Sequence, residues 1–295
     1  MASLRDIRKH IKAVKNIRQI TYAMKMVSSA RIKKAQSQIL GFKPYISYLE
    51  NVVFSLKGEM MEEDFKTTGL YRFFKKESLT NSIGIVVVGG DKGLCGSFNS
   101  SIINLAVKLI RNNKGKKIYI IPVGKKSYDF FKKVKEVNLY YQIYNIFPKV
   151  NYAHASLLSS KIIEAYEKLN LDEIYMVYSE FRNMMKQEFK SISFLPIINR
   201  IGGDEGKENL EDFIFEPEKS ILLKNLIPKY INMRVYSVLL ENQASELAAR
   251  MQAMELASKN AGELIDELTL RMNKLRQAQI TTELNEIVSG ASAIQ

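Results

Sequence analysis

The C-terminal part of the chain carries a sustained heptad pattern. Apolar or small residues recur at spacings of three and four, which keeps one stripe of a helix against a partner helix. These positions are Met233, Ser237, Leu240, Ala244, Leu247, Met251, Met254, Ser258, Ala261, Ile265, Leu268, Met272 and Leu275. Between Tyr230 and Val288 there is no proline and a single glycine, Gly262, so nothing forces a break. The pattern predicts a helical rod roughly 90 Å long.

A second amphipathic helix is predicted at the N-terminus, over about residues 4–61. Ser3 followed by Asp6 has the pattern of a capping box, which begins a helix. Gly41 and Pro44 lie inside the segment and predict a kink or break there. The apolar stripe consists of Leu4, Ile7, Ile11, Val14, Ile17, Ile20, Met24 and Val27.

The middle of the chain alternates between strand and helix patterns. Continuous apolar or alternating runs predict strands, and amphipathic runs predict the helices between them. The expected strands are 83–90, 116–124, 138–144, 173–181 and 187–197, and the expected helices are 98–111, 125–134 and 153–169. This alternation predicts a three-layer α/β domain, Rossmann-like, with a mostly parallel sheet.

The predicted organisation therefore has five segments. They are an N-terminal coiled-coil helix (1–61), a loop (62–81), an α/β domain (82–200), a second loop (201–216) and a C-terminal coiled-coil helix with its tip (217–295). Pro228 is a candidate interruption of the last helix. Single helices of this length would expose their apolar stripes, so we expect them to pair as a long antiparallel coiled coil. The C-terminal helix is the longer one, and its end should project beyond its partner.

The charge of the chain is basic and unevenly distributed. Lys and Arg outnumber Asp and Glu by 44 to 31, a formal net charge of +13. Residues 1–43 carry eleven basic side chains against one acid, whereas residues 241–295 carry five against eight acids. Opposite charges on the two helices favour their pairing.

Several classes of site are excluded by composition. The one cysteine, Cys95, excludes an internal disulfide and any CxxC pair. The two histidines, His10 and His154, are far apart in the sequence, so we expect no metal site. The N-terminus lacks the apolar core of a signal peptide, and no apolar run reaches the length of about 18 residues that spans a membrane. We expect a cytosolic protein, or one peripheral to a membrane that others span.

Two stretches suggest binding of nucleotides or nucleic acids. The sequence GGDKGLCGSFN (89–99) follows a strand and could expose backbone amides to a phosphate, but its spacing fits neither known phosphate loop. We favour a tight turn or an interaction loop, and Cys95 has no histidine partner that would make it a nucleophile. The basic stretch 8–19 could bind nucleic acid, although a solvated helix face, or one facing an acidic protein, is favoured. We find no catalytic constellation.

Three separated stretches resemble one family. The segment 241–293, ending in ITTELNEIVSGASA, closely resembles the gamma subunit of F-type ATP synthases. The stretch IRKHIKAVKNIRQITYAMKMVSSARIKKAQ (7–36) is similar to the first helix of that family, and GGDKGLCGSFN is similar to its GLCG loop. Through their order and spacing, these stretches extend the resemblance over nearly the whole chain.

The resemblance implies a central rotor shaft. In this family the coiled coil enters a ring of three alpha and three beta subunits, and the α/β domain stands on the membrane ring of c subunits with the epsilon subunit beside it. ATP chemistry belongs to the beta subunits, so the resemblance implies no catalytic residue, no cofactor and no nucleic-acid partner. It also implies a peripheral membrane protein, without direct membrane insertion, on the cytoplasmic side of the bacterial plasma membrane.

The resemblance further implies partner-contact residues. Arg250, Arg276, Gln277, Thr281 and Glu283 match positions that contact the loops of the catalytic ring. Met24, with Lys25 beside it, matches a position near the acidic lever loop of the beta subunit, and Cys95 matches a position close to that loop. Two alternatives remain open, a basic coiled-coil nucleic-acid-binding protein and a nucleotide-binding α/β enzyme.

Overall fold

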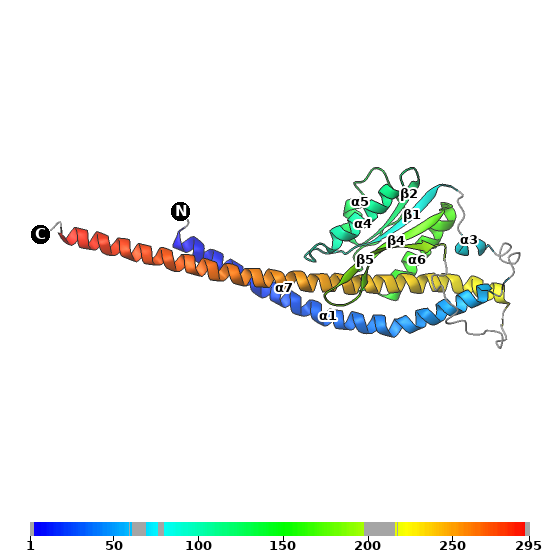
Figure 1. Cartoon of the computed structure of the whole chain (residues 1–295), viewed down its shortest axis with the longest axis horizontal. Coiled ribbons are helices and arrows are strands. Elements are labelled where there is room, and N and C mark those ends of the chain that lie inside the picture. Colours follow the sequence, from blue (N-terminus) through cyan, green and yellow to red (C-terminus); the bar gives the residue numbers. More distant parts are fainter. Residues whose placement is uncertain are drawn as a thin grey trace. The chain divides into compact units, whose positions relative to one another are not determined.

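The computed structural model describes residues 3–58, 60, 69–75, 80–197, 216 and 218–292. The chain divides into two compact units (Figure 1). We call Met1–Ser28 with Arg250–Gln295 the helical-pair unit, and Ser29–Ala249 the α/β unit. The predicted loop 201–216 lies almost entirely outside the described residues.

The two longest elements are the predicted terminal helices. Helix α1 spans Leu4–Gly58 and helix α7 spans Lys219–Ser292. Helix α1 begins with the predicted capping box, in which the Ser3 amide donates to Asp6 Oδ2 and the Asp6 amide donates to Ser3 Oγ, both at 3.2 Å.

The helices continue through both prolines, so a break at Pro44 or Pro228 was a wrong expectation, whereas a kink at Pro44 stays a prediction. An internal proline costs a helix about 3 kcal/mol. Downstream of Pro44, Leu49, Val53 and Leu56 are buried in the core of the α/β unit. Each such side chain stabilises the fold by about 1.5–3 kcal/mol, which together outweighs the cost of the proline.

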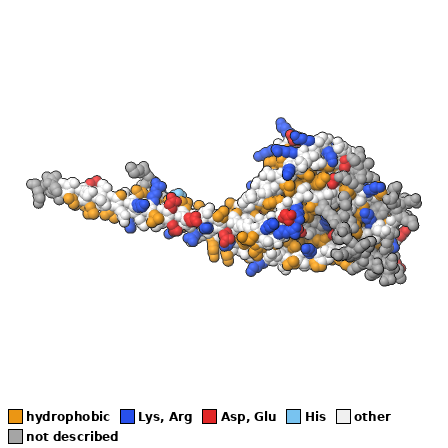
Figure 2. Space-filling view, viewed as in Figure 1, with side chains coloured by type: hydrophobic (Ala, Val, Ile, Leu, Met, Phe, Trp, Pro, Cys, Tyr) orange, Lys and Arg blue, Asp and Glu red, His pale blue; other side chains and the backbone are white. Residues whose placement is uncertain are grey.

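The helical-pair unit is an antiparallel pair made by the start of α1 and the end of α7 (Figure 1). Ile7, Ile11 and Val14 of α1 form one buried cluster, and the α7 members of that cluster are Ala261, Ile265 and Leu268. All three α7 residues belong to the predicted heptad seam, which the structure confirms. Figure 2 shows that apolar side chains also reach the surface of this unit, among acidic and basic ones.

The seam of α1 departs from the predicted stripe after Val14. The 3–4 spacing continues through Arg18, Thr21, Lys25 and Ser28. Thr21 and Ser28 are 9% and 3% exposed, and the Thr21 hydroxyl donates to the Ile17 carbonyl at 3.0 Å. The expected members Ile17, Ile20 and Val27 are instead more than half exposed. The stripe read from hydrophobicity was therefore wrong in this part of α1, because the helix keeps its heptad register through polar residues.

At Arg18 the seam position of α1 faces a glycine of α7. A Cβ atom at Gly262 would lie 3.6 Å from the guanidinium carbon of Arg18. The single glycine of the long helical run thus lies beneath the largest side chain of the α1 seam.

In the α/β unit, five strands form one sheet in the order β3-β2-β1-β4-β5. The first four strands are parallel and β5 is antiparallel to β4, as expected for a mostly parallel sheet. The strands are β1 (Ser82–Val88), β2 (Lys117–Val123), β3 (Asn138–Leu139), β4 (Glu173–Phe181) and β5 (Gln187–Leu195). The strand expected over 138–144 is reduced to two residues and one bridge at Ile143, because an edge segment has a neighbour on one side only.

Shorter helices connect these strands. Helices α4 and α6 agree with the predicted segments to within two residues, and α5 begins where expected but ends earlier. Their bounds are α4 Phe98–Asn112, α5 Lys125–Phe131 and α6 Tyr152–Lys168. A short helix, α3 (Tyr71–Phe74), lies in the segment that was expected to be a loop, and its two phenylalanines are buried.

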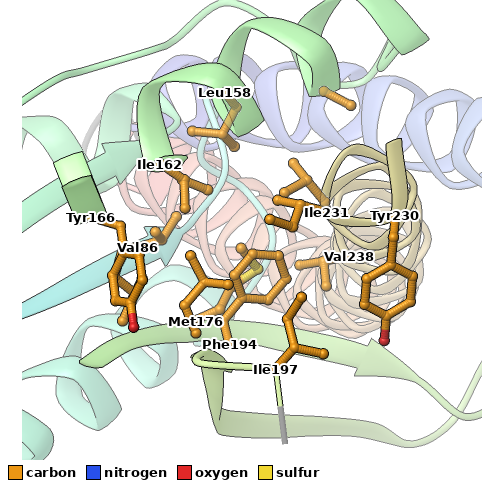
Figure 3. Close-up of a cluster of buried hydrophobic side chains, with 14 of the residues drawn as sticks. Val86, Leu158, Ile162, Tyr166, Met176, Phe194, Ile197, Tyr230, Ile231 and Val238 are labelled. Atoms are coloured by element: carbon orange, nitrogen blue, oxygen red, sulfur yellow. The ribbon is translucent and has the colours of Figure 1, made fainter. Parts of the chain in front are cut away.

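The sheet is covered on both faces, which confirms the three-layer prediction. Ile83, Ile85 and Val87 of β1 pack in one cluster with residues of α4 and α5. Val86 and Val88 pack in a second cluster with residues of α1, α6 and α7. Figure 3 shows the second cluster, where Ile231 and Val238 of α7 lie beside Met176 and Phe194 of the sheet. The last helix of the chain thus completes the core of the α/β unit.

A charged cluster lies beside this core. Glu180 of β4 forms ion pairs with Arg182, at 3.2 Å, and with Lys190 of β5. Glu241 of α7 lies close enough to these charged groups, and to Lys43 of α1, for them to affect the pKa of its carboxyl. Burial of Glu241, with repulsion from Glu180 as a smaller cause, raises the pKa of its carboxyl to about 7. None of the described residues gives its Oε2 atom a hydrogen-bond partner.

We predict that Gly262→Ala stabilises the chain. Alanine is favoured over glycine inside a helix by about 1 kcal/mol, and the new methyl group would make ordinary contact with Arg18. The midpoint of thermal unfolding, followed by circular dichroism, should rise. The neighbouring change Ala261→Gly should lower it and serves as the matched control. A lower midpoint for Gly262→Ala would show that the Arg18 contact tolerates no side chain.

We predict that Glu241→Gln removes part of the pH dependence of stability. The raised pKa means that folded Glu241 binds more protons than the unfolded residue between its ordinary value of 4.5 and about 7. The free energy of unfolding should therefore fall as pH rises through this window, by at most about 3 kcal/mol.

In the glutamine variant this decrease in the free energy of unfolding should be absent. At pH 8 the variant should therefore be more stable than the parent chain. Urea unfolding at pH 5 and pH 8 measures both effects, with the exposed Glu267→Gln as the control. Parallel pH profiles for the parent chain and Glu241→Gln would contradict the assignment.

Candidate partner-binding site on the helical pair

Large apolar side chains are exposed on both flanks of the α1 seam. Ile17, Ile20 and Val27 follow one flank, and Tyr22 and Met26 follow the other. Between 51% and 60% of each side chain is exposed. Apolar groups gathered on one segment in this way are typical of a surface that binds another protein.

Met24 and Lys25 lie within this segment. Met24 is half-buried and shares the flank of Ile17, Ile20 and Val27. Lys25 Nζ lies 2.5 Å from Oε1 of Glu255 on α7, and 57% of the Glu255 side chain is exposed. An exposed ion pair of this kind contributes about 0–1 kcal/mol. Lys25 could therefore exchange Glu255 for a carboxylate of another protein at little cost.

A basic groove of about 460 Å³ lies on the helical pair. It is lined by Lys15, Arg18, Gln19, Tyr22, Ser258 and Ile265. Two cations, an amide and a phenol can all donate hydrogen bonds to a carboxylate. The groove therefore suits an acidic segment of a partner. Arg18 belongs to the basic stretch 8–19, for which a solvated helix face or one facing an acidic protein was expected. Tyr22 was not singled out as a contact residue, and the available signal was the 3–4 spacing, which places it beside the seam.

The end of α7 has no covering helix among the described residues. All side chains described from Arg276 to Ser289 are exposed, including the expected contact residues Arg276, Gln277, Thr281 and Glu283. The Thr281 hydroxyl is used locally, donating to the Gln277 carbonyl at 2.9 Å. The tip also exposes an apolar stripe made of Ile280, Leu284, Ile287 and Val288.

Arg250 and Cys95 differ from the other expected contact residues because both are buried, at 8% and 2% exposure. Cys95 lies in the turn after β1, where Asn99 Nδ2 donates to its sulfur at 3.2 Å. Leu94 beside it is 64% exposed and has a φ angle of +62°. A non-glycine residue held in this conformation and exposed to solvent is a better contact candidate than the buried thiol. The signal in the sequence was the pair Leu94-Cys95 between two glycines.

The place where a nucleotide would bind in this sheet is filled by α7. In open α/β sheets ligands bind at the carboxyl ends of the strands, where the strand order reverses, here between β1 and β4. A Cβ atom at Gly90 in this loop would lie 3.0 Å from the carboxyl carbon of Glu246. A carboxylate in this position opposes the binding of a phosphate.

The glycine loop is also closed by its own hydrogen bonds. Asp91 accepts from the backbone amides of Lys125, Asn145 and Phe147, each at 2.8 Å. Within the loop, the Gly90 amide donates to Asn99 Oδ1 at 2.8 Å, so this amide is already engaged. Within the described ranges, no three His, Cys, Asp or Glu side chains are grouped to hold a metal ion. No described helix is long and apolar enough to cross a membrane.

Comparison with known proteins finds similarity to one family over nearly the whole chain. The family model described as ATP synthase matches residues 3–294. The ATP synthase gamma chain of Elusimicrobium minutum is 42% identical over 301 residues, covering 100% of this chain and 99% of that one. The gamma chain of Geobacter metallireducens is 40% identical over the full length of both chains.

Solved structures show the same fold. A chain of the Tetrahymena thermophila mitochondrial ATP synthase central stalk and c-ring structure is 26% identical, with a TM-score of 0.61, and the match covers 81% of this chain and 99% of that one. A chain of the Euglena gracilis mitochondrial ATP synthase rotor, 20% identical with a TM-score of 0.65, matches over 94% of this chain and 98% of its own. With the family model matched over nearly every residue and gamma chains about 40% identical over full length, this chain belongs to the ATP synthase family, as a gamma chain.

Proposed function

We propose that this chain is the central-stalk rotor subunit of an F-type ATP synthase, a non-catalytic shaft that carries torque between the membrane c-ring and the catalytic ring of alpha and beta subunits. Full-length similarity to gamma chains supports this function. The observation that carries it is the end of α7, where polar and apolar side chains are exposed together. An isolated helix end of this composition is marginal in water, so it suits a site inside another protein.

Torque transfer requires a stiff shaft whose surface differs around its axis. The buried seam of the helical pair provides stiffness, because α1 and α7 cannot bend independently while it remains packed. The exposed flanks provide asymmetry, with apolar side chains, a basic groove and an acidic α7 surface at different angles. As the shaft turns, each catalytic site would face a different surface and favour a different conformation.

The proposed partner contacts are those that the family resemblance implies, and the exposed and basic surfaces support them. Met24, Lys25 and the basic groove would meet an acidic loop of the beta subunit. Arg276, Gln277, Thr281 and Glu283 would meet the surrounding loops of the catalytic ring. Cys95 would contribute indirectly, by shaping the turn that exposes Leu94, and Arg250 would act from a largely buried position.

The remaining partners and the location are part of the same proposal. The α/β domain would stand on the c-ring, with the epsilon subunit beside it. The chain would be a peripheral membrane protein on the cytoplasmic side of the bacterial plasma membrane, coupling ion transport to ATP synthesis. A nucleotide-binding enzyme is not favoured, because Glu246 and the hydrogen bonds of Asp91 occupy the loop that such an enzyme would use.

We predict that the chain co-purifies with a ring of nucleotide-binding subunits. An affinity-tagged chain isolated from gently solubilised membranes should bring alpha-like and beta-like subunits with it, identified by mass spectrometry and by ATP hydrolysis. Washing at high salt tests whether the association survives the screening of surface charges. Recovery of the chain alone, or bound to nucleic acid, would overturn the proposed function.

We predict that a chain ending at Gln277 folds but couples poorly. The truncation leaves Ala261, Ile265 and Leu268 in place, so the helical content and unfolding midpoint should barely change. Complexes containing it should assemble less well, or pump fewer ions per ATP hydrolysed, because the exposed tip no longer reaches the ring. Removing only residues 293–295 is the control. Full coupling after the longer truncation would count against the contact role of the tip.

A further inference from the structure

Three polar side chains of α7 are buried against the α/β unit. Asn242, Gln243 and Ser245, which we call the α7 polar row, are 0%, 6% and 0% exposed. They follow a stretch of α7 whose buried side chains are mostly apolar, among them Tyr230, Ile231, Val235, Val238, Leu239 and Leu240. Burying polar groups where apolar ones would pack requires compensating hydrogen bonds. The partners of the row therefore indicate what it does.

The row bonds to backbone groups of two separate segments. Gln243 Oε1 accepts from the Val150 amide at 2.9 Å, immediately before α6 begins. Asn242 Oδ1 accepts from the Ser179 amide at 3.2 Å, and Ser245 Oγ donates to the Ser179 carbonyl at the same distance. Both backbone groups of one strand residue are thus held by α7.

Ser179 needs these bonds because β4 is longer than its neighbour. The parallel ladder between β1 and β4 ends at the pair Val87 and Val177. Beyond that pair, the Ser179 amide and carbonyl lack a β1 residue opposite them, while β5 continues on the other side. Side chains of α7 take the place of the missing ladder bonds.

Apolar packing and hydrogen bonds constrain a helix differently. Burial of apolar area is non-directional, so a helix held by it alone can shift a little around its axis with small loss. Hydrogen bonds weaken steeply when their distance or angle changes. A rotation of α7 by one residue, about 100°, or a slide of about 1.5 Å would break all three bonds of the row.

We propose that the α7 polar row locks α7 against rotation relative to the sheet and the segment before α6. Torque applied to α7 would then be passed to the rest of the α/β unit, and the reverse, without slip. Its members are positioning residues that touch neither ATP nor the coupling ion. This inference rests on the proposed rotor function, and it assigns the transfer of torque within the chain to particular side chains.

Isosteric variants test the lock. Gln243→Met and Asn242→Leu keep the volume of the side chain but remove the accepting oxygen. Gln243→Glu and Asn242→Asp keep an accepting oxygen and serve as rescue variants. Leu239→Ala is the matched control, because it removes a fully buried apolar side chain of the same helix but none of the hydrogen bonds of the row.

The measurement is the ratio of ATP-driven ion uptake to ATP hydrolysis by complete complexes in sealed vesicles. Both isosteric variants should lower this ratio about twofold or more, because slip lets ATP be hydrolysed without turning the whole rotor. The Glu and Asp variants should restore the ratio. Leu239→Ala should lower the unfolding midpoint and leave the ratio of assembled complexes unchanged.

Other outcomes decide against the lock. An unchanged ratio in both isosteric variants, or an equal fall with Leu239→Ala, would leave the row with a merely structural role. Should the isosteric variants fail to assemble, Ser245→Ala removes a single bond and decides the question, with an unchanged ratio overturning the proposal. If the parent chain supports no coupled uptake in any complex, the proposed function itself is overturned.

Discussion

The fold depends on the shared burial of one helix, α7. Its first part covers a face of the sheet, where Ile231 and Val238 complete the core of the α/β unit. Its later part supplies Ala261, Ile265 and Leu268 to the seam of the helical-pair unit. A helix of 74 residues has too little intrinsic stability to remain ordered without such packing. Neither hydrophobic cluster would close without α7, and α7 would not persist without them.

The heptad pattern was predictable in α7 and only in part in α1. Every seam position expected in α7 is buried or half-buried. In α1, exposed isoleucines next to the seam imitate a buried stripe, so hydrophobicity alone predicted Ile17 in the seam. The helix instead buries Thr21 and Ser28, and Arg18 keeps the seam spacing with an exposed side chain. Periodicity identifies a stripe by composition, but the partner helix decides which side chains it covers. That Gly262 lies against Arg18 could not be read from the sequence either.

In the α/β unit, too, only part of the structure could be predicted: its strands, but not the role of the glycine loop 89–99. Strands of β-branched residues such as β1 were predictable because both faces are buried. The role of the glycine loop could not be decided from the sequence, since the same GGDKGLCG residues could bind a phosphate or form a closed turn. The decision comes from Glu246, which is distant in the sequence and reaches Gly90 only after α7 packs on the unit. Cys95 was likewise readable as a turn residue, whereas its burial depends on the folded loop.

The type of contact that α7 makes differs between three successive parts of the helix. Between Tyr230 and Leu240 the helix is held by apolar burial, which is strong but non-directional. At Asn242 to Ser245 directional hydrogen bonds fix its angle. From Arg276 onward the side chains described are exposed, so they are available for contact with another protein. A helix that is anchored, then locked, then exposed can receive torque at one end and deliver it at the other, which a uniformly packed helix could not do.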